Sequence, residues 1–92
     1  MKVKAIMCQT CDDVVYSRTE GDYRECSCGA VNTDGGQRYT KYGTFRNAPA
    51  KKIIINVDTT AIALYNDWKE MLDIYGLIKG ADTPRIQQHI IC

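Results

Sequence analysis

The segment CQTCDDVVYSRTEGDYRECSCG, residues 8–29, holds four of the five cysteines of the chain in two short pairs. Two residues separate Cys8 from Cys11, one separates Cys26 from Cys28, and 14 residues lie between the pairs. In a zinc ribbon each short loop turns both thiolates toward one ion, and the hairpin between the loops brings the pairs together. The spacing therefore predicts a site with four thiolate ligands.

We call the two short loops that carry the cysteine pairs, residues 8–11 and 26–28, the metal loops. The backbone of each must reverse direction just after its second cysteine, often through a residue with positive φ, a conformation that glycine adopts without penalty. Gly29 follows Cys28 and meets this need. Asp12 follows Cys11, and aspartate tolerates this conformation better than most residues. Asp12 and its neighbour Asp13 are expected to lie in a solvated loop.

Structural Zn(2+) is the predicted cofactor, and two alternatives remain open. A redox pair would use Cys8 and Cys11 alone, and an iron–sulfur cluster fits the same four cysteines. A closed four-thiolate site has no open coordination position, which argues against zinc catalysis. The chain also lacks a phosphate-loop pattern, so we expect no enzyme. His89 and the terminal Cys92 are expected not to be ligands.

Composition indicates one globular domain over residues 1–92. The chain is 45% hydrophobic, and its 12 basic and 11 acidic side chains give a net charge of +1, so global charge identifies no partner. The first ten residues hold no apolar run of signal-peptide length, and the apolar run at 53–55 is too short for a membrane. We expect a cytoplasmic protein with no membrane contact, whose thiols stay reduced.

The predicted fold class is α+β. Residues 1–48 form a zinc-ribbon-like β region with strands at 2–7, 14–17, 22–25 and 37–42, and residues 49–92 add a strand at 51–57 and a long amphipathic helix at 60–79. The helix is indicated by apolar residues at spacings of three and four: Ala61, Leu64, Tyr65, Trp68, Met71, Leu72 and Tyr75. Asp58, Thr59 or Thr60 caps its start, and Trp68 is expected in the core. The same stripe offers a homo-oligomer contact. Residues 84–91 fit a helix or a strand.

A basic and aromatic run follows the second cysteine pair. No acidic residue occurs between Asp34 and Asp58, and Arg38, Lys41, Arg46, Lys51 and Lys52 alternate there with Tyr39, Tyr42 and Phe45. Nucleic acid would use the aromatic rings for stacking and the cations for phosphate. A small nucleotide would sit on the Asp34-Gly35-Gly36 turn, whose backbone amides can approach a phosphate. The remaining interpretation is a plain hairpin turn with solvated charges.

Several motifs in order resemble a family of short zinc-ribbon-like proteins found in phages and phage-derived regions. They are the first cysteine pair, Ser17-Arg18, Asp22-Tyr23, Cys-Ser-Cys-Gly at 26–29, Asp-Gly-Gly at 34–36, and Tyr39 with Lys41, over residues 4–41. Gly21 replaces the usual histidine, Tyr23 a phenylalanine and Lys41 an arginine, which removes a planar bidentate donor. The resemblance implies a viral context and a bound metal, and no activity.

The predicted function is non-catalytic binding of a host protein or nucleic acid during infection, in the host cytoplasm. The alternative is an anti-defence protein that sequesters a small anionic nucleotide signal. The candidate ligand-binding residues are Arg18, Asp34, Gly35, Gly36, Arg38, Tyr39, Lys41, Tyr42 and Arg46.

Overall fold

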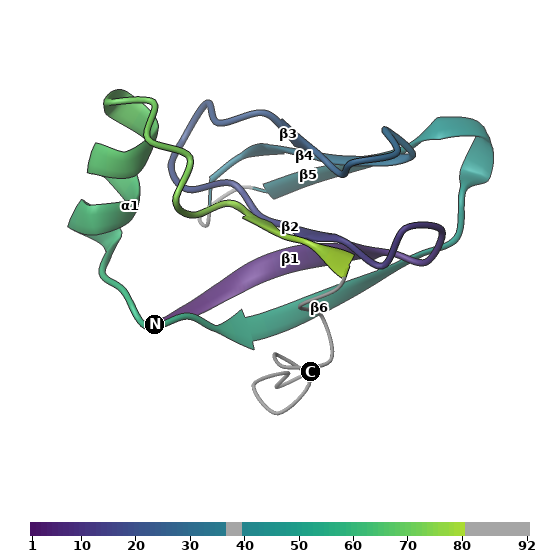
Figure 1. Ribbon diagram of the computed structural model, residues 1–92, viewed down its shortest axis with the longest axis horizontal. Helices are drawn as coiled ribbons and strands as arrows, with labels where there is room; N and C mark the ends of the chain where they lie inside the picture. The colour runs from purple at the N-terminus through teal and green to yellow at the C-terminus, as the bar shows by residue number, and fades with distance from the viewer. Residues whose placement is uncertain (37–39, 81–92) are drawn as a thin grey trace.

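The computed structural model describes residues 1–36 and 40–80, and within them seven strands form two antiparallel sheets beside one α-helix (Figure 1). The first sheet has the order β6-β1-β2-β7, with β6 at Ala50–Asn56, β1 at Lys2–Cys8, β2 at Val14–Val15 and β7 at Leu77–Ile78. The second has the order β3-β4-β5, with β3 at Arg24–Glu25, β4 at Val31–Gly35 and β5 at Thr40–Thr44.

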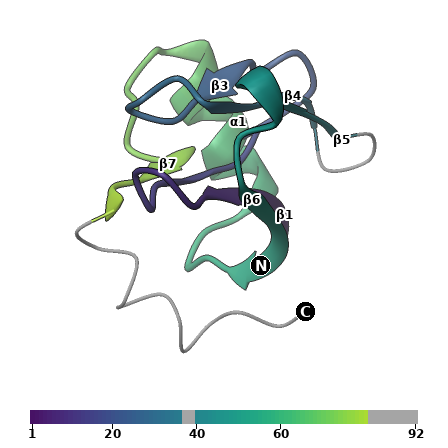
Figure 2. The same cartoon turned by 90° about the vertical axis from the view of Figure 1, so that its right-hand side faces the viewer.

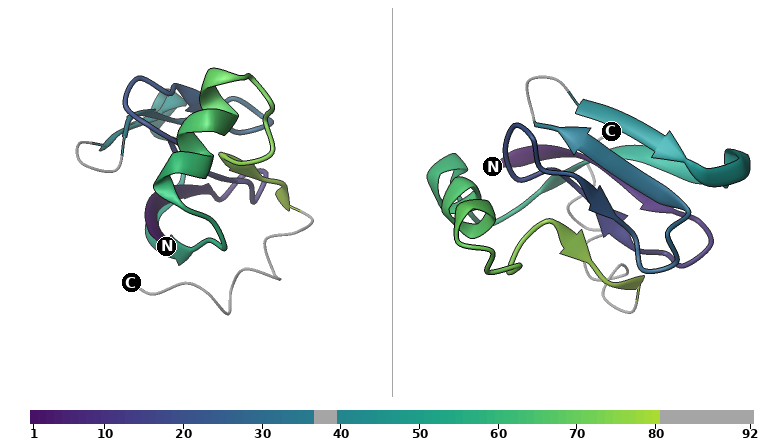
Figure 3. Two further views of the ribbon diagram at one scale, coloured as in Figure 1. Left: turned by 90° about the vertical axis from the view of Figure 1, so that its left-hand side faces the viewer. Right: turned by 90° about the horizontal axis from the view of Figure 1, so that it is seen from above.

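The two sheets lie one above the other (Figure 2), with the helix α1, Ala61–Lys69, at one end of both (Figure 3). A 3-10 turn, η1 at Phe45–Asn47, joins β5 to β6 at the opposite end (Figure 1). These findings confirm a mixed fold of sheet and one helix. The helix α1 and the turn η1 therefore lie at opposite ends of the two sheets.

Strand β1 has buried residues on both faces because it lies between β6 and β2 in one sheet and beneath the other sheet, although its Lys2 and Lys4 side chains are exposed. Val3 and Ala5 pair with Ile55 and Ile53 and pack against Leu64 of α1. The alternate residues Ile6 and Cys8 pack with Val15, Cys26 and Val31 between the two sheets. Burying these branched side chains supplies the main favourable energy of folding in so small a chain.

Two predicted strands are confirmed almost to the residue, at β1 and β6. The predictions at 14–17 and 22–25 correspond to the two-residue strands β2 and β3. Strand β4 was not predicted, because Asn32, Asp34 and Gly35 are depleted in strands, yet Val31 and Thr33 alternate toward the interior. For the strand expected at 37–42, β5 begins at Thr40, and residues 37–39 lie outside the described part.

The predicted helix at 60–79 is wrong in length, since α1 has only nine residues. Its start is confirmed: the Thr60 hydroxyl accepts a hydrogen bond from the Ala63 amide at 3.2 Å. The helix ends because Met71 and Asp73 take positive φ values of 56° and 57°. The backbone then leaves the helical path, and β7 occupies part of the predicted helix.

The stripe of apolar residues therefore does not form one buried face. Leu64 is buried and Trp68 half-buried against Tyr65, with ring centroids 5.9 Å apart, but Ile62, Met71 and Leu72 are exposed. The homo-oligomer contact through residues 60–79 stays a prediction. Across residues 1–36 and 40–80, no helix has the length and apolar character needed to cross a membrane. The predictions for residues 84–91, His89 and Cys92 lie outside the described residues.

Candidate metal centre

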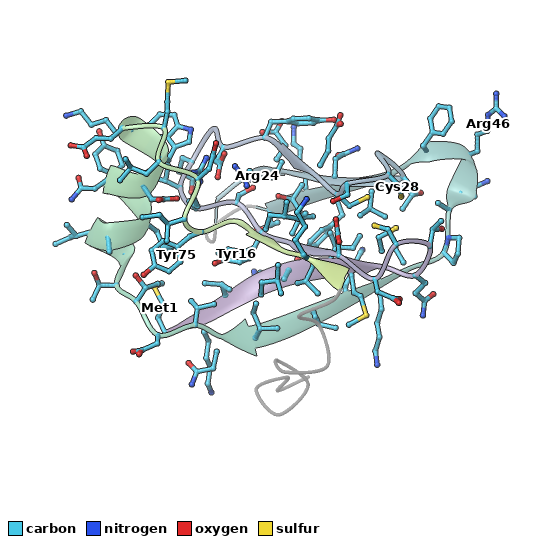
Figure 4. The ribbon with its side chains drawn as sticks, in the orientation of Figure 1. Met1, Tyr16, Arg24, Cys28, Arg46 and Tyr75 are labelled. Atoms are coloured by element: carbon cyan, nitrogen blue, oxygen red, sulfur yellow. The ribbon has the colours of Figure 1, made fainter. Side chains whose placement is uncertain are left out.

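The four predicted cysteines converge at the end of the sheets opposite α1, where Figure 4 labels Cys28. Their sulfur atoms all lie within 4.8 Å of one another, with Cys28 Sγ 3.6 Å from Cys8 Sγ and 3.5 Å from Cys26 Sγ. A zinc–sulfur bond of about 2.3 Å gives a tetrahedron with edges of about 3.8 Å. The cluster therefore fits one tetrahedral metal ion with four thiolate ligands.

The two metal loops reverse as the sequence predicts. Asp12 has a φ of 63° and Gly29 a φ of 76°, each directly after the second cysteine of its pair. The Asp12 amide donates to the Cys8 carbonyl at 2.8 Å, and the Gly29 amide donates to the Cys26 carbonyl at 3.0 Å. The Cys26 sulfur also accepts a hydrogen bond from the Val31 amide at 3.4 Å.

Asp13 joins the two loops, and its expected solvated position is wrong. The side chain is 2% exposed, and its carboxylate accepts hydrogen bonds from the Ser27 and Gly80 amides, both at 2.7 Å. Burial raises the pKa of this carboxyl, but the hydrogen bonds from Ser27 and Gly80 outweigh burial and lower the pKa overall. Asp13 thereby holds the second metal loop against the first and anchors the chain after β7.

Without a metal, the pKa values of the Cys8 and Cys11 thiols move in opposite directions. Burial raises the pKa of the Cys8 thiol, but hydrogen bonds from the backbone of Cys11 and Thr10 outweigh it and lower the pKa to about 7. Burial, together with the neighbouring thiols of Cys28 and Cys8, raises the pKa of Cys11 to about 12. A bound cation would remove this conflict, because a coordinated thiol is deprotonated outright.

The arrangement fits a shared metal better than a redox pair. All four are free thiols in the structure, and the Cys26 pair lies directly against the Cys8 pair. A redox site made of Cys8 and Cys11 alone would not require this contact. The sulfur-only ligand set suits zinc and iron alike.

Arg18, a predicted ligand residue, is buried among carboxylates. Its Nε donates to Asp22 Oδ2 at 2.8 Å, and its Nη1 donates to Asp67 Oδ2 at 2.8 Å and to Asp73 Oδ1 at 3.3 Å. The ion pair with Asp67 connects the loop after β2 to α1, 49 residues later. The Arg18 guanidinium is therefore buried and stabilises the fold through these ion pairs, so it is not offered to a ligand at the surface.

Asp67 ends α1 as well as pairing with Arg18. Its Oδ1 accepts from the Ile74 amide and its Oδ2 from the Tyr75 amide, both at 3.0 Å, while its carbonyl accepts from the Leu72 amide. These bonds hold the turn that interrupts the predicted helix. The only sequence signal for this role is an aspartate three residues after the buried Leu64, on the apolar side of the helix.

Among the predicted ligand residues that the structure describes, Lys41, Tyr42 and Arg46 do not share one surface. Lys41 lies opposite Asp34 in the β4–β5 pairing, whereas its neighbour Tyr42 points to the other face, as does its partner Thr33. Arg46 lies at the far end in η1 (Figure 4), with its guanidinium 5.1 Å from the Phe45 ring centre. Arg38 and Tyr39 are outside the described residues.

The Asp34-Gly35-Gly36 segment lies at the end of β4 rather than in an open turn. Asp34 Oδ1 accepts a hydrogen bond from the Gly35 amide at 2.7 Å, and Gly35 has a φ of 91°. Gly36 is buried, and a Cβ added there would lie 2.8 Å from the Glu20 amide nitrogen. Gly36 is thus packed against Glu20, which leaves less room for a phosphate than expected.

Tyr42 and Lys52 are brought together, with the Lys52 ammonium 5.2 Å from the Tyr42 ring centre. Both side chains line a groove together with Lys4, Ile53 and Ile54. Sequence analysis did not single out Lys4, because it lies 38 positions from Tyr42 in the chain.

Comparison with protein-family models gives a match over the cysteine-bearing part of the chain. A family model described as "Domain of unknown function (DUF7695)" matches residues 1–44. No curated protein and no solved structure matches the chain. Over its cysteine-bearing half, the chain is therefore similar to a domain family of unknown function.

Proposed function

We propose that this chain is a small zinc-stabilised protein of the phage type, which acts by binding rather than by catalysis. The observation that carries the proposal is the four-thiol cluster within 4.8 Å. Four thiolates complete a tetrahedral shell, so a bound zinc would have no open position for substrate or water. The ion would supply folding energy instead.

The need for such energy follows from the small core. The cluster connects β1, the turn before β2 and the loop between β3 and β4, so the metal would join both sheets. Structural zinc contributes apparent binding energies of about 10–16 kcal/mol in finger peptides. Metal-linked folding on this scale is sufficient to decide whether so small a domain folds.

The proposed action is to bind a host protein or nucleic acid in the host cytoplasm during infection. The phage context rests on the resemblance over residues 4–41. Strands β1 and β6, with the sequences KVKAIMC and AKKIIIN, contain four lysines and no acidic residue, which favours an anionic partner. A second candidate function, sequestration of a nucleotide signal, is favoured by the groove beside Tyr42.

Native mass spectrometry of protein purified without chelators tests the proposed function. We expect the native mass to exceed the acid-denatured mass by one zinc ion, and a Cys26→Ser variant to lose the ion and unfold. Cys92→Ser is the matched control and should keep the metal. A protein that stays folded after complete metal removal would contradict the structural role.

A further inference from the structure

A groove with a volume of about 260 Å³ opens between β5 and the paired strands β1 and β6. It is lined by Lys4 of β1, Tyr42 of β5, and Lys52, Ile53 and Ile54 of β6. Ligand pockets for drug-sized molecules span roughly 300–1,000 Å³. The groove is therefore large enough for one ring system with a short substituent.

The strand register places two of the lysines on one face. Lys4 pairs with Ile54, and Lys52 pairs with Ile6, so all four side chains lie on the same face of the β1–β6 ribbon. Ile6 is buried between the two sheets, which shows that this face points toward β4 and β5. The two ammonium groups therefore border the groove next to an apolar floor.

Tyr42 forms the opposite wall. It is half-buried and packs against the cluster of Ile6 and Val31, and burial raises the pKa of its hydroxyl, so the ring stays neutral. The Lys52 ammonium lies 5.2 Å from the ring centre, in cation–π range. A ring face and long methylene stems suit a flat aromatic group, while the ammonium groups suit a negative charge.

We propose that this groove binds an aromatic base that carries a phosphate, whether as part of single-stranded nucleic acid or as a free nucleotide. The inference rests on the proposed binding function and names the ligand class for it. Tyr42 stacks on the base, and Lys4 and Lys52 contact phosphate. Both sources present this same chemistry, and only the length of the ligand separates them.

The size of the effect follows from two lysine–phosphate contacts. Each contact to a single strand contributes about 0.7 to the slope of log affinity against log salt, so the groove gives a slope of about −1.4. Affinity should then fall about sevenfold between 50 and 200 mM salt. Stacking on Tyr42 should contribute about 5- to 150-fold.

The test uses zinc-loaded protein and two probes, a fluorescein-labelled 12-nucleotide oligothymidine and thymidine monophosphate, measured by anisotropy and by calorimetry. The variants are Lys4→Ala, Lys52→Ala and Tyr42→Leu, with Tyr42→Phe retaining the ring. Lys51→Ala is the matched control, because Lys51 pairs with Met7 and points to the opposite face of β6. Circular dichroism and the zinc content of each variant show that it is folded and loaded.

Weaker binding by Lys4→Ala, Lys52→Ala and Tyr42→Leu, with Lys51→Ala and Tyr42→Phe unchanged, would support the groove. Tight oligonucleotide binding with weak mononucleotide binding would identify a single strand as the source, and equal binding per site would identify a free nucleotide. Folded, zinc-loaded protein that binds neither probe would overturn the inference while leaving the metal role intact. Equal losses in Lys51→Ala and Lys52→Ala, or preference for duplex DNA, would also overturn it.

Discussion

Replacing Asp67 by asparagine should destabilise the protein much more than replacing Asp73. Asp67 is 2% exposed, and its two carboxylate oxygens accept hydrogen bonds from Arg18 and from the Ile74 and Tyr75 amides. Asparagine has the same shape, but its amide group turns one of these acceptors into a donor. One N–H group then faces another N–H group in a buried site, and the ion pair loses its charge.

Removing one partner of a buried ion pair costs about 3–5 kcal/mol. Arg18 keeps its 2.8 Å pair with Asp22, so we expect the lower end, a loss of about 3 kcal/mol. A domain of this size has a total stability of about 5–15 kcal/mol, so the loss is a large fraction of it. The corresponding fall in Tm is about 12–24 °C.

Urea denaturation of zinc-loaded wild type, Asp67→Asn and Asp73→Asn at pH 7 measures the difference. Asp73 contacts the same Arg18 at 3.3 Å, but it is 65% exposed and so should matter little. Equal midpoints for the two variants would show that the buried carboxylate does not stabilise the fold and would refute the reasoning.

The pH dependence supplies a second check on the same residue. Burial raises the pKa of Asp67, but the bonds from Arg18 and from the Tyr75 and Ile74 amides outweigh it and lower the pKa below its ordinary value. A lowered pKa gives stability that is complete above the unfolded-state value of about 3.9 and is lost as the pH falls through the folded-state value. The difference between wild type and Asp67→Asn should therefore be constant between pH 6 and 8.

Two further predictions concern the turns at Gly80 and Met71. In Gly80→Ala the new Cβ would collide with the Cys11 carbonyl oxygen, so this variant should release zinc to a chromogenic chelator faster than the control Gly43→Ala. In the control only the end of the Asn32 side chain must move. Equal release rates would contradict the contact between Gly80 and Cys11. Met71→Gly should raise the free energy of unfolding, measured by urea denaturation, by about 1 kcal/mol, because Met71 has a φ of 56° and is 82% exposed. A lower free energy of unfolding would show that the methionine contributes packing that outweighs the strain.

The cluster of four cysteines could be predicted from the sequence because the information for it is local. The cysteine spacings and the residues Asp12 and Gly29 are enough to define two reversing loops, and the structure has both reversals. Strands β1 and β6 were also predictable, since their branched residues favour a buried strand whatever the partner.

The role of Arg18 and the end of α1 could not be predicted, because both depend on contacts between residues far apart in the sequence. Arg18 looks like a surface cation until α1 brings Asp67 to it, and nothing near residue 18 in the sequence indicates this contact. The apolar period continues past residue 69, but hydrogen bonds from the turn to Asp67 end the helix there. Long-range polar contacts of this kind override local periodicity.

The pairing of β6 with β1 and of β7 with β2 shows whether the part of the chain that matches the family could fold by itself. The family match ends at residue 44, yet the sheet that carries Cys8 gains both of its edge strands from residues 50–56 and 77–78. Cutting the chain at residue 48 would uncover the hydrogen-bonding edge of β1 and the side chains that Ile53 and Ile55 cover. The cysteine-bearing half is therefore not expected to fold on its own. Grafting the metal loops onto another protein would require a substitute for both edge strands.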